Sequence, residues 1–323
     1  MTIPSRLGAA LLIALAAQAH GQAPDSFPNR PVRLIIPVAA GGGPDTIGRA
    51  VGMKLTDNLG QTFVVDNRAG ASGAIAVELA SRAAPDGYTI LLISASQVIR
   101  PLLFKVPYDL FKDFVPITQL SSQSYVLMAS PALPVKSVSE LISHARANPG
   151  KLNYASVGQG SQIHLTTELF RTMAKFEAVH VPYKGIGPAY PDLIGGSIQF
   201  MFGSIITSQG HIKAKRLNAL AVSGPKRIKA APELPTVAEA GVKGFAVTQW
   251  YALLAPAGTP PKLVDFLSKE ANKALHQPEV AGRITAEGSE AVGATPQQLG
   301  AHMKAEHDKW VRVIKQTGIK GEE

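Results

Sequence analysis

Residues 32–48 read VRLIIPVAAGGGPDTIG, and this stretch decides the fold. Its first five residues form a largely apolar run, which is typical of a strand buried on both faces. Three glycines and a proline follow, and then Ile47, Val51 and Leu55 recur at roughly helical spacing. The stretch therefore predicts a strand, a tight glycine turn and a helix that begins at Pro44.

The glycine turn has two interpretations. Glycines let a backbone approach a ligand closely, and a helix N-terminus presents free N–H groups and a positive dipole end. Such a turn can hold an anion without any arginine or lysine. It is equally compatible with a plain strand-to-helix connection, because it does not follow the G-x-G-x-x-G spacing and lacks the lysine of a P-loop.

The same alternation continues along the chain. Strands at 63–65 and 88–93 with a helix at 74–83 complete a βαβαβ unit, which indicates a parallel sheet. A second set comprises a strand at 125–130, a helix opened by a Ser137–Glu140 capping box and ending at Ala147, a strand at 152–156, a helix at 162–173, and strands at 178–181, 198–202, 217–222 and 250–256. Thr259-Pro260 and Thr295-Pro296 predict the starts of the last helices. We therefore expect an α/β protein with two lobes.

A second glycine-rich turn repeats the arrangement of the first. GQGSQ, at residues 158–162, lies between a predicted strand and a predicted helix, with Ser161 as the expected N-cap. Open α/β sheets bind ligands outside the carboxyl ends of their strands. Two helix N-termini, one in each lobe, would suit a molecule that carries carboxylates.

Composition excludes several classes of chemistry. The 323 residues contain no cysteine, which rules out disulfides, thiol catalysis and thiolate metal sites. The formal net charge is +9, but the basic residues are scattered and aromatic residues make up only 6%, which argues against nucleic-acid binding. His164, His180 and His211 are isolated and no G-x-S-x-G elbow is present, so we expect no metal, no cofactor and no catalysis.

The first 23 residues read as an export signal. Arg6 precedes an apolar run at residues 7–17, which is shorter than a membrane span, and small residues follow it. We expect cleavage after Ala19 or Ala23 and an exported, periplasmic protein. A buried N-terminal helix is the alternative.

Several blocks of the chain closely resemble one family. They include PVRLIIPVAAGGGPDTIGR, VVDNRAGASGAIAVELASRAAPDGYTILL, KLNYASVGQGSQIHLTTELF, VHVPYKGIGPAYPDLIGGSIQFMF and WYALLAPAGTPPKLVDFL. The chain is similar in these blocks to the Bug-type solute receptors, the periplasmic binding components of tripartite tricarboxylate transporters. The resemblance implies a periplasmic binding-protein type II fold with a ligand cleft between two lobes. It places lobe 1 at residues 24–123 plus about 250–323, and lobe 2 at about 124–249.

The resemblance also implies a ligand site made from four loops. The residues that match are Val38, Ala40, Gly41, Gly42, Gly43 and Asp45 in the first loop, Ser94, Ser96 and Gln97 in the second, Ser156, Gly158, Gln159, Gly160, Ser161 and Gln162 in the third, and Gly203 and Ser204 in the fourth. Two features depart from the family pattern. Ala39 and Ala40 stand where prolines are common, and Gly203 stands where aspartate is common, so we expect altered contacts and a wider cleft.

The implied function is that of a non-catalytic receptor. It would capture a di-, tri- or aromatic carboxylate, act as a monomer and deliver the ligand to membrane permease subunits. Asp45 is the one acidic residue in the assigned loops, and in the first turn of a helix we expect it to contact its own backbone amides. An ammonium group would then lack an acidic partner, so we expect a ligand without one. An exported enzyme of α/β architecture and a ligand sensor that feeds a signalling partner are the alternatives.

Overall fold

The structure is a computed structural model that describes residues 27–321, so the predicted export segment lies outside the described residues. The first elements are β1 (Val32–Ile36), α1 (Gly43–Leu59), β2 (Phe63–Asn67), the short 3-10 helix η1 (Ala71–Gly73), α2 (Ala74–Ser81), β3 (Thr89–Ser94) and α3 (Ala95–Leu103). Next come β4 (Phe114–Ala129), α4 (Val138–Ala147), β5 (Asn153–Ser156), α5 (Gln162–Ala174), β6 (Val179–Pro182), α6 (Ala189–Gly195), β7 (Phe200–Ser204), α7 (Ile205–Lys213) and β8 (Asn218–Val222). The chain closes with β9 (Thr248–Pro256), α8 (Pro261–Leu275), α9 (Pro278–Ala286), β10 (Glu290–Ala291) and α10 (Pro296–Thr317).

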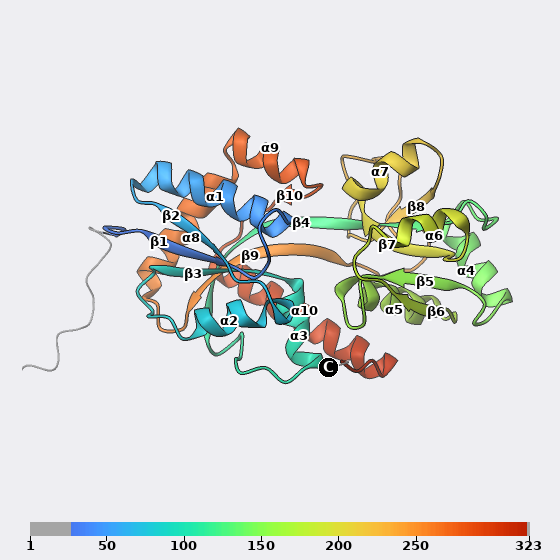
Figure 1. The fold of residues 1–323 in the computed structure, drawn as a ribbon, viewed down its shortest axis with the longest axis horizontal. Helices are drawn as coiled ribbons and strands as arrows, with labels where there is room; N and C mark the ends of the chain where they lie inside the picture. The colour runs from blue at the N-terminus through green and yellow to red at the C-terminus, as the bar shows by residue number, and fades with distance from the viewer. Residues whose placement is uncertain (1–26, 322–323) are drawn as a thin grey trace, which may run out of the picture.

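One sheet connects two halves of the molecule. Its strand order is β2-β1-β3-β9-β4-β7-β5-β6, and β8 and β10 also pair with β4. β1 is parallel to β2 and β3, and β5 is parallel to β6 and β7, whereas β4 and β9 run antiparallel to their neighbours. Figure 1 shows β4 and β9 crossing from one half to the other. The expected α/β class is confirmed, with a parallel sheet inside each half and antiparallel pairing at the crossing.

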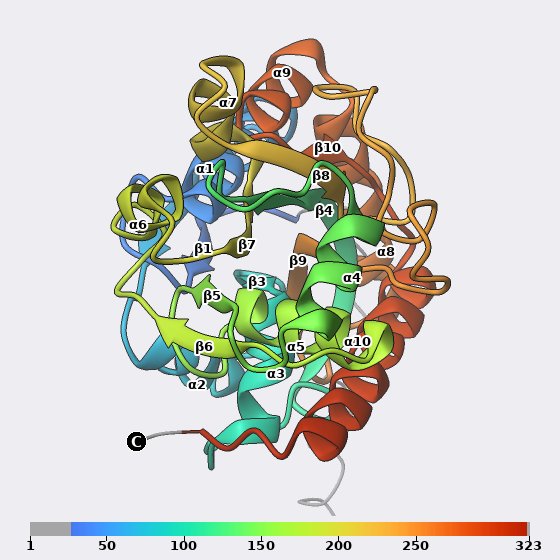
Figure 2. The ribbon, with the colours of Figure 1, turned by 90° about the vertical axis from the view of Figure 1, so that its right-hand side faces the viewer.

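Each half has its own hydrophobic core. In the first half, Leu34 on β1 packs with α1 and α8 on one face of the sheet, and Trp250 packs with α2 and α10 on the other. In the second half, aromatic residues such as Phe170 dominate the core between β7 and α5. α10 serves both halves, because Met303 belongs to the first core and Trp310 to the second. Figure 2 shows α10 running alongside α5.

The predicted helix starts agree with the structure in part. Thr295 caps α10 with a capping box to Gln298, as expected. The expectation at Thr259 is wrong, because Pro260 is the N-cap of α8 and a second proline takes the first helical position. Thr259 instead donates its hydroxyl to the carbonyl of Pro256 at 2.7 Å.

Ser137 caps α4, but the rest of its predicted capping box differs. Its hydroxyl accepts a hydrogen bond from the amide of Glu140 at 3.2 Å. The Glu140 carboxylate accepts from the amide of Lys136, one residue before the expected position. Within residues 27–321, no helix combines the length and the apolar character needed to cross a bilayer.

Candidate functional site

Four helices follow the carboxyl ends of strands, either directly or after a short loop. α1 and α3 follow β1 and β3 in the first half, and α5 and α7 follow β5 and β7 in the second. The serine N-caps of α3, α5 and α7 each accept a hydrogen bond from an amide of their own helix; these are Ser94, Ser161 and Ser204. The N-cap of α1 is Gly42, and no side chain among the described residues caps this helix. The first amides of α1 are therefore the ones best placed to bind an anion.

A cavity of about 190 Å³ lies between the two halves, at the starts of α1 and α7. Its lining includes Gly43 from α1, Ser204 and Thr207 from the start of α7, Gln123 from β4, Tyr251 from β9 and Glu287 after α9. The structure thus brings two of the predicted site residues, one from each half, to a single cavity. The other predicted residues do not line it.

Polar side chains of the crossing strands face this cavity. Gln123 pairs with Gln249 across β4 and β9, and strand alternation puts Tyr251 on the same face. The Gln123 amide donates to the Ser204 hydroxyl at 3.1 Å and to the Glu287 carbonyl at 2.8 Å, so it ties the two halves together. The buried Oε1 of Gln249 has no hydrogen-bond partner in the described part of the chain. Burial raises the pKa of Tyr251, so its phenol stays a hydrogen-bond donor at neutral pH.

Asp45 shapes the first loop from inside. Its carboxylate accepts hydrogen bonds from the amide of Gly41 at 2.9 Å, from Asn67 at 2.9 Å and from Arg49 at 3.0 Å. Burial acts to raise the pKa of Asp45, but these three donors outweigh it and hold the pKa below its usual value. The carboxylate is therefore engaged within its own loop, including with a backbone amide, as the sequence suggested.

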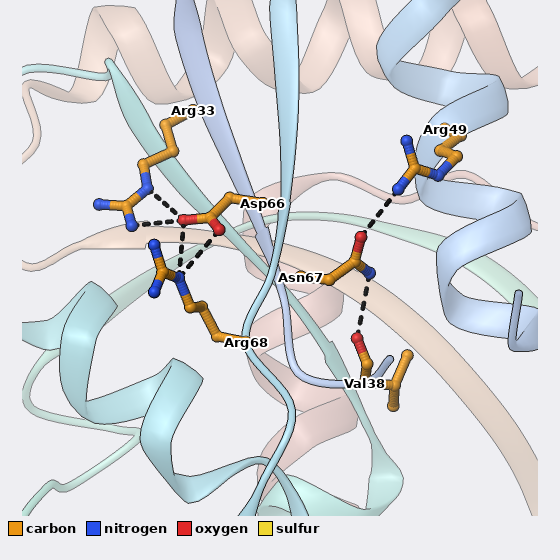
Figure 3. A network of polar contacts seen from close by, with 6 residues as sticks. All are labelled: Arg33, Val38, Arg49, Asp66, Asn67 and Arg68. Atoms are coloured by element: carbon orange, nitrogen blue, oxygen red, sulfur yellow. Dashed lines mark hydrogen bonds and ion pairs between the residues drawn. The ribbon is translucent and has the colours of Figure 1, made fainter. Parts of the chain in front are cut away.

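Asn67, at the end of β2, is a residue that the sequence analysis missed. Its amide donates to the carbonyl of Val38 at 3.0 Å as well as to Asp45, and its Oδ1 accepts from Arg49 at 2.8 Å (Figure 3). Beside it, Asp66 binds the guanidinium groups of its two arginine neighbours, which Figure 3 also shows. The sequence signal that could have identified Asn67 is its place as a polar residue at the carboxyl end of a parallel strand.

Replacing Asn67 with aspartate should loosen the first loop. The change removes two donated hydrogen bonds and places a second carboxylate beside that of Asp45. We expect the free energy of unfolding to fall by about 2 kcal/mol and ligand affinity to fall with it. Urea unfolding measures the first effect. Asn29→Asp is the matched control, because Asn29 uses its side-chain oxygen as an acceptor for Tyr88; equal losses in both variants would contradict the role given to Asn67.

The side chains of the second predicted loop form hydrogen bonds with one another and with η1. The Ser94 hydroxyl donates to Oε1 of Gln97 at 2.8 Å, and the Gln97 amide donates to the carbonyl of Ser72 at 3.1 Å. Both side chains are buried. The backbone amide of Ser96 donates to the Ser94 hydroxyl at 3.3 Å, which completes the N-cap of α3. These residues hold η1 against α3 and fix the shape of the first half beside the cavity.

Two histidines form hydrogen bonds with the third predicted loop. The Ser156 hydroxyl is 2.7 Å from Nε2 of His180, and the Gly160 amide donates to Nδ1 of His164 at 3.0 Å. The two imidazole rings stack with centroids 3.8 Å apart and planes 8° apart. In the sequence these histidines are isolated from each other. The fold brings them together beneath the loop because α5 and β6 pack side by side on β5.

The two glutamine side chains of the third loop contact other parts of the second half. Gln162 accepts from the Tyr125 hydroxyl at 3.1 Å and donates to the carbonyl of Thr248 at 2.8 Å, which joins α5 to both crossing strands. Gln159 lines a separate, open cavity of about 440 Å³ beside Arg171. Neither side chain lines the cavity between the halves.

Gly203 does not open space in the cleft. A Cβ at this position would lie 2.8 Å from the methyl carbon of Met128 and 3.5 Å from the hydroxyl of Tyr190. The position therefore faces the core of the second half, where a methionine fills the space. The expectation that Gly203 widens the cleft is wrong for this reason.

The stability of the protein should fall between pH 6.5 and pH 4. Burial, and then the neighbouring His180, lower the pKa of His164 to about 4. The unfolded chain takes up a proton near pH 6.5, so acid favours unfolding until the folded protein is protonated too. At pH 5 we expect His164 to account for a loss of about 2 kcal/mol relative to pH 7. Urea unfolding of the wild type and of His164→Gln at both pH values isolates this contribution, and identical pH dependence in the two proteins would contradict it.

Comparisons with known proteins cover nearly the whole chain. The family profile of the tripartite tricarboxylate transporter family receptor matches residues 47–319. Protein BugT of Bordetella pertussis is 36% identical over 313 residues, 96% of this chain and 96% of BugT. An R. palustris protein solved with adipate is 35% identical with a TM-score of 0.76, covering 91% of this chain and 99% of that one. MatC from Rhodopseudomonas palustris, solved with bound malate, is 31% identical with a TM-score of 0.71, covering 89% and 100%. The expected two-lobed α/β fold is confirmed.

Proposed function

Because the chain belongs to the tripartite tricarboxylate transporter receptor family, we propose that it is a periplasmic receptor that captures an organic carboxylate and delivers it to a permease. The cavity between the halves, at the uncapped N-terminus of α1, is the observation that carries this proposal. Adipate and malate, found with two similar proteins, are both amine-free dicarboxylates, which supports the ligand class. In this role the protein binds its ligand and closes its lobes around it, and it catalyses no reaction.

The ligand binds between two helix N-termini. One carboxylate accepts hydrogen bonds from the first amides of α1, beside Gly43. The other end of the ligand faces the start of α7, where the Thr207 hydroxyl lines the cavity. A cavity of about 190 Å³ favours small aliphatic dicarboxylates over aromatic ones. A ligand held from both sides stabilises the closed state of the lobes.

We propose the lobe boundaries and the remaining loops as the sequence predicts them. Lobe 1 comprises residues 24–123 and about 250–323, and lobe 2 comprises about 124–249. In this proposal the first, second and third loops surround the wider cleft, and Asp45, Ser94 and Gln97 act through the shape of their loops. Residues 1–23 direct export and are removed. The mature receptor acts as a monomer.

A thermal-shift screen tests the function. Purified protein lacking residues 1–23 is heated with adipate, malate, citrate, terephthalate, aspartate and glutamate in turn. A ligand present at 100 times its dissociation constant raises stability by about 2.7 kcal/mol. Stabilisation by a dicarboxylate, together with a smaller radius of gyration in solution scattering, is the expected result. Stabilisation by none of these carboxylates would contradict the proposal.

Amine-free dicarboxylates should bind at least tenfold more tightly than aspartate or glutamate, which is about 1.4 kcal/mol. An ammonium group that leaves water needs an acidic partner. The cavity offers one carboxylate, that of Glu287, which is partly exposed to solvent. Competition calorimetry compares the two ligand classes. Micromolar binding of aspartate that disappears in Glu287→Gln would show that Glu287 pairs with an ammonium group and that the prediction is wrong.

A further inference from the structure

A second cavity, about 600 Å³ in volume, lies beside the crossing strands. It is larger than the cavity between the helix ends and falls in the range of 300–1,000 Å³ that is usual for small-molecule sites. We propose that it is a second binding site, for a small organic anion with an apolar body. The lining residues, their charges and an unpaired imidazole nitrogen support this assignment.

The second cavity and the candidate cleft lie on opposite faces of the crossing strands. Ser122 and Ser124 on β4 and Thr248 on β9 line the second cavity. Gln123 lies between the two serines and lines the first cavity. Because successive side chains of a strand point to opposite faces, the second cavity is at the back of the hinge. Ser289, next to the crossing strands, lines both cavities.

Both lobes contribute walls to the second cavity. The loop 225–230 after β8 forms one side, and residues 288–292, which contain β10, form the other. Lys226 and Glu290 form an ion pair between these two walls, at 2.7 Å. Both side chains are partly exposed, so the pair adds little stability of its own. It does show that the two walls are close enough for one small ligand to contact both.

The charge of the lining favours an anion. Three basic side chains belong to the loop, and two of them are paired: Lys226 with Glu290, and Arg227 with Glu239 at 3.0 Å. Lys229 has no ion-pair partner among residues 27–321. An ammonium group at the rim of a largely apolar cavity attracts an anion such as a carboxylate or phosphate. The apolar walls, which include Ile228, suit the hydrocarbon body of such a ligand.

His302 of α10 supplies a second, independent observation. It lines the cavity, and its Nε2 is buried without a hydrogen-bond partner in the described part of the chain. Its ring packs edge-on against Trp250, with centroids 5.0 Å apart. Glu306 and Lys309 are the charged groups that act on it, and burial lowers its pKa, so the imidazole is neutral at pH 7. Buried polar atoms are nearly always paired, so Nε2 is a polar atom beside this cavity that the described chain leaves unsatisfied.

The two cavities are coupled if the lobes close as a receptor's lobes do. This consequence rests on the proposed function, whereas the site itself does not. Closure at the front of the hinge draws the walls at the back apart. A ligand that contacts both back walls therefore stabilises the open state and weakens binding at the front, and linkage makes the effect reciprocal.

Calorimetry with benzoate and phenyl phosphate tests the site. Both probes carry an apolar ring, and they separate a carboxylate from a phosphate as the anionic group. The titrations use the wild type and Gly43→Val, in which the front cleft is blocked. Saturable binding of either probe to both proteins, with one site in the blocked variant, is the expected result. No binding of either probe, or binding that Gly43→Val abolishes, would overturn the proposal.

Two further variants place the probe. Lys229→Glu should weaken binding at least tenfold, and Lys243→Glu, on an exposed lysine that does not line the cavity, should leave it unchanged. Ala281→Phe, which fills the cavity from α9, should abolish it. Unchanged affinity in Lys229→Glu and Ala281→Phe would overturn the assignment. Because these readouts do not use the front cleft, they stand whether or not the carboxylate screen succeeds.

Discussion

Replacing Gly43 with valine should lower the affinity for a dicarboxylate at least 100-fold, about 2.7 kcal/mol, and leave the protein folded. A Cβ at Gly43 points into the cavity, 3.5 Å from the Tyr251 hydroxyl and 3.4 Å from a carboxylate oxygen of Glu287. These are ordinary contacts, and Gly43 does not have a left-handed backbone. The two methyl groups of valine would extend beyond the Cβ and occupy the place of the bound carboxylate at the start of α1.

Substitutions at two other glycines serve as comparisons for Gly43→Val. Gly210→Val, on the exposed side of α7, is the matched control, because no described atom beyond its chain neighbours and the adjoining helix backbone lies within 4 Å of a Cβ there. Gly42→Val probes the N-cap itself, where φ is −81° and the nearest atoms to a Cβ are 3.8 Å away. Calorimetry on each variant, with circular dichroism as the check of folding, gives the result. Wild-type affinity in Gly43→Val would remove the α1 N-terminus from the site.

Replacing Trp310 with alanine should lower the free energy of unfolding by about 3–5 kcal/mol. The Trp310 side chain is fully buried in the core of the second half, although α10 begins in the first. Its indole N–H donates to the Glu306 carboxylate at 3.1 Å, and the Lys309 ammonium lies 4.8 Å from the ring centroid. The substitution leaves a cavity and takes one donor from a carboxylate that is only 7% exposed.

Neighbouring substitutions on α10 separate packing from helix propensity. Val311→Ala changes a residue that is 40% exposed and should alter stability by less than about 0.5 kcal/mol. Trp310→Phe keeps an aromatic ring but loses the hydrogen bond. Its loss of unfolding free energy should lie between those of Trp310→Ala and Val311→Ala. Urea unfolding at pH 7 measures all three. A cost for Trp310→Ala similar to that for Val311→Ala would show that α10 does not hold the two halves together.

Local patterns predicted the elements inside each half well. The apolar run at β1 was predicted residue for residue, since a strand buried on both faces leaves a clear mark in the sequence. β4 was predicted only from residue 125, although it begins at Phe114. Its middle reads SSQS, and those polar residues belong to a strand because β9 pairs with them across the hinge. The polar run gave no local signal, and its partner lies more than a hundred residues away.

The sequence alone determined the α/β class and the glycine turns that open α1 and α5, because strand burial, helix periodicity and turn chemistry act between near neighbours. Only the tertiary structure brings the start of α1 to the start of α7, rather than to that of α5, and selects the side chains that surround their cavity. Asn67 reaches Val38 across 29 residues, and Gln123 reaches Glu287 across 164. Such contacts depend on how the sheet twists and where its strands cross, and no periodicity of the chain records them.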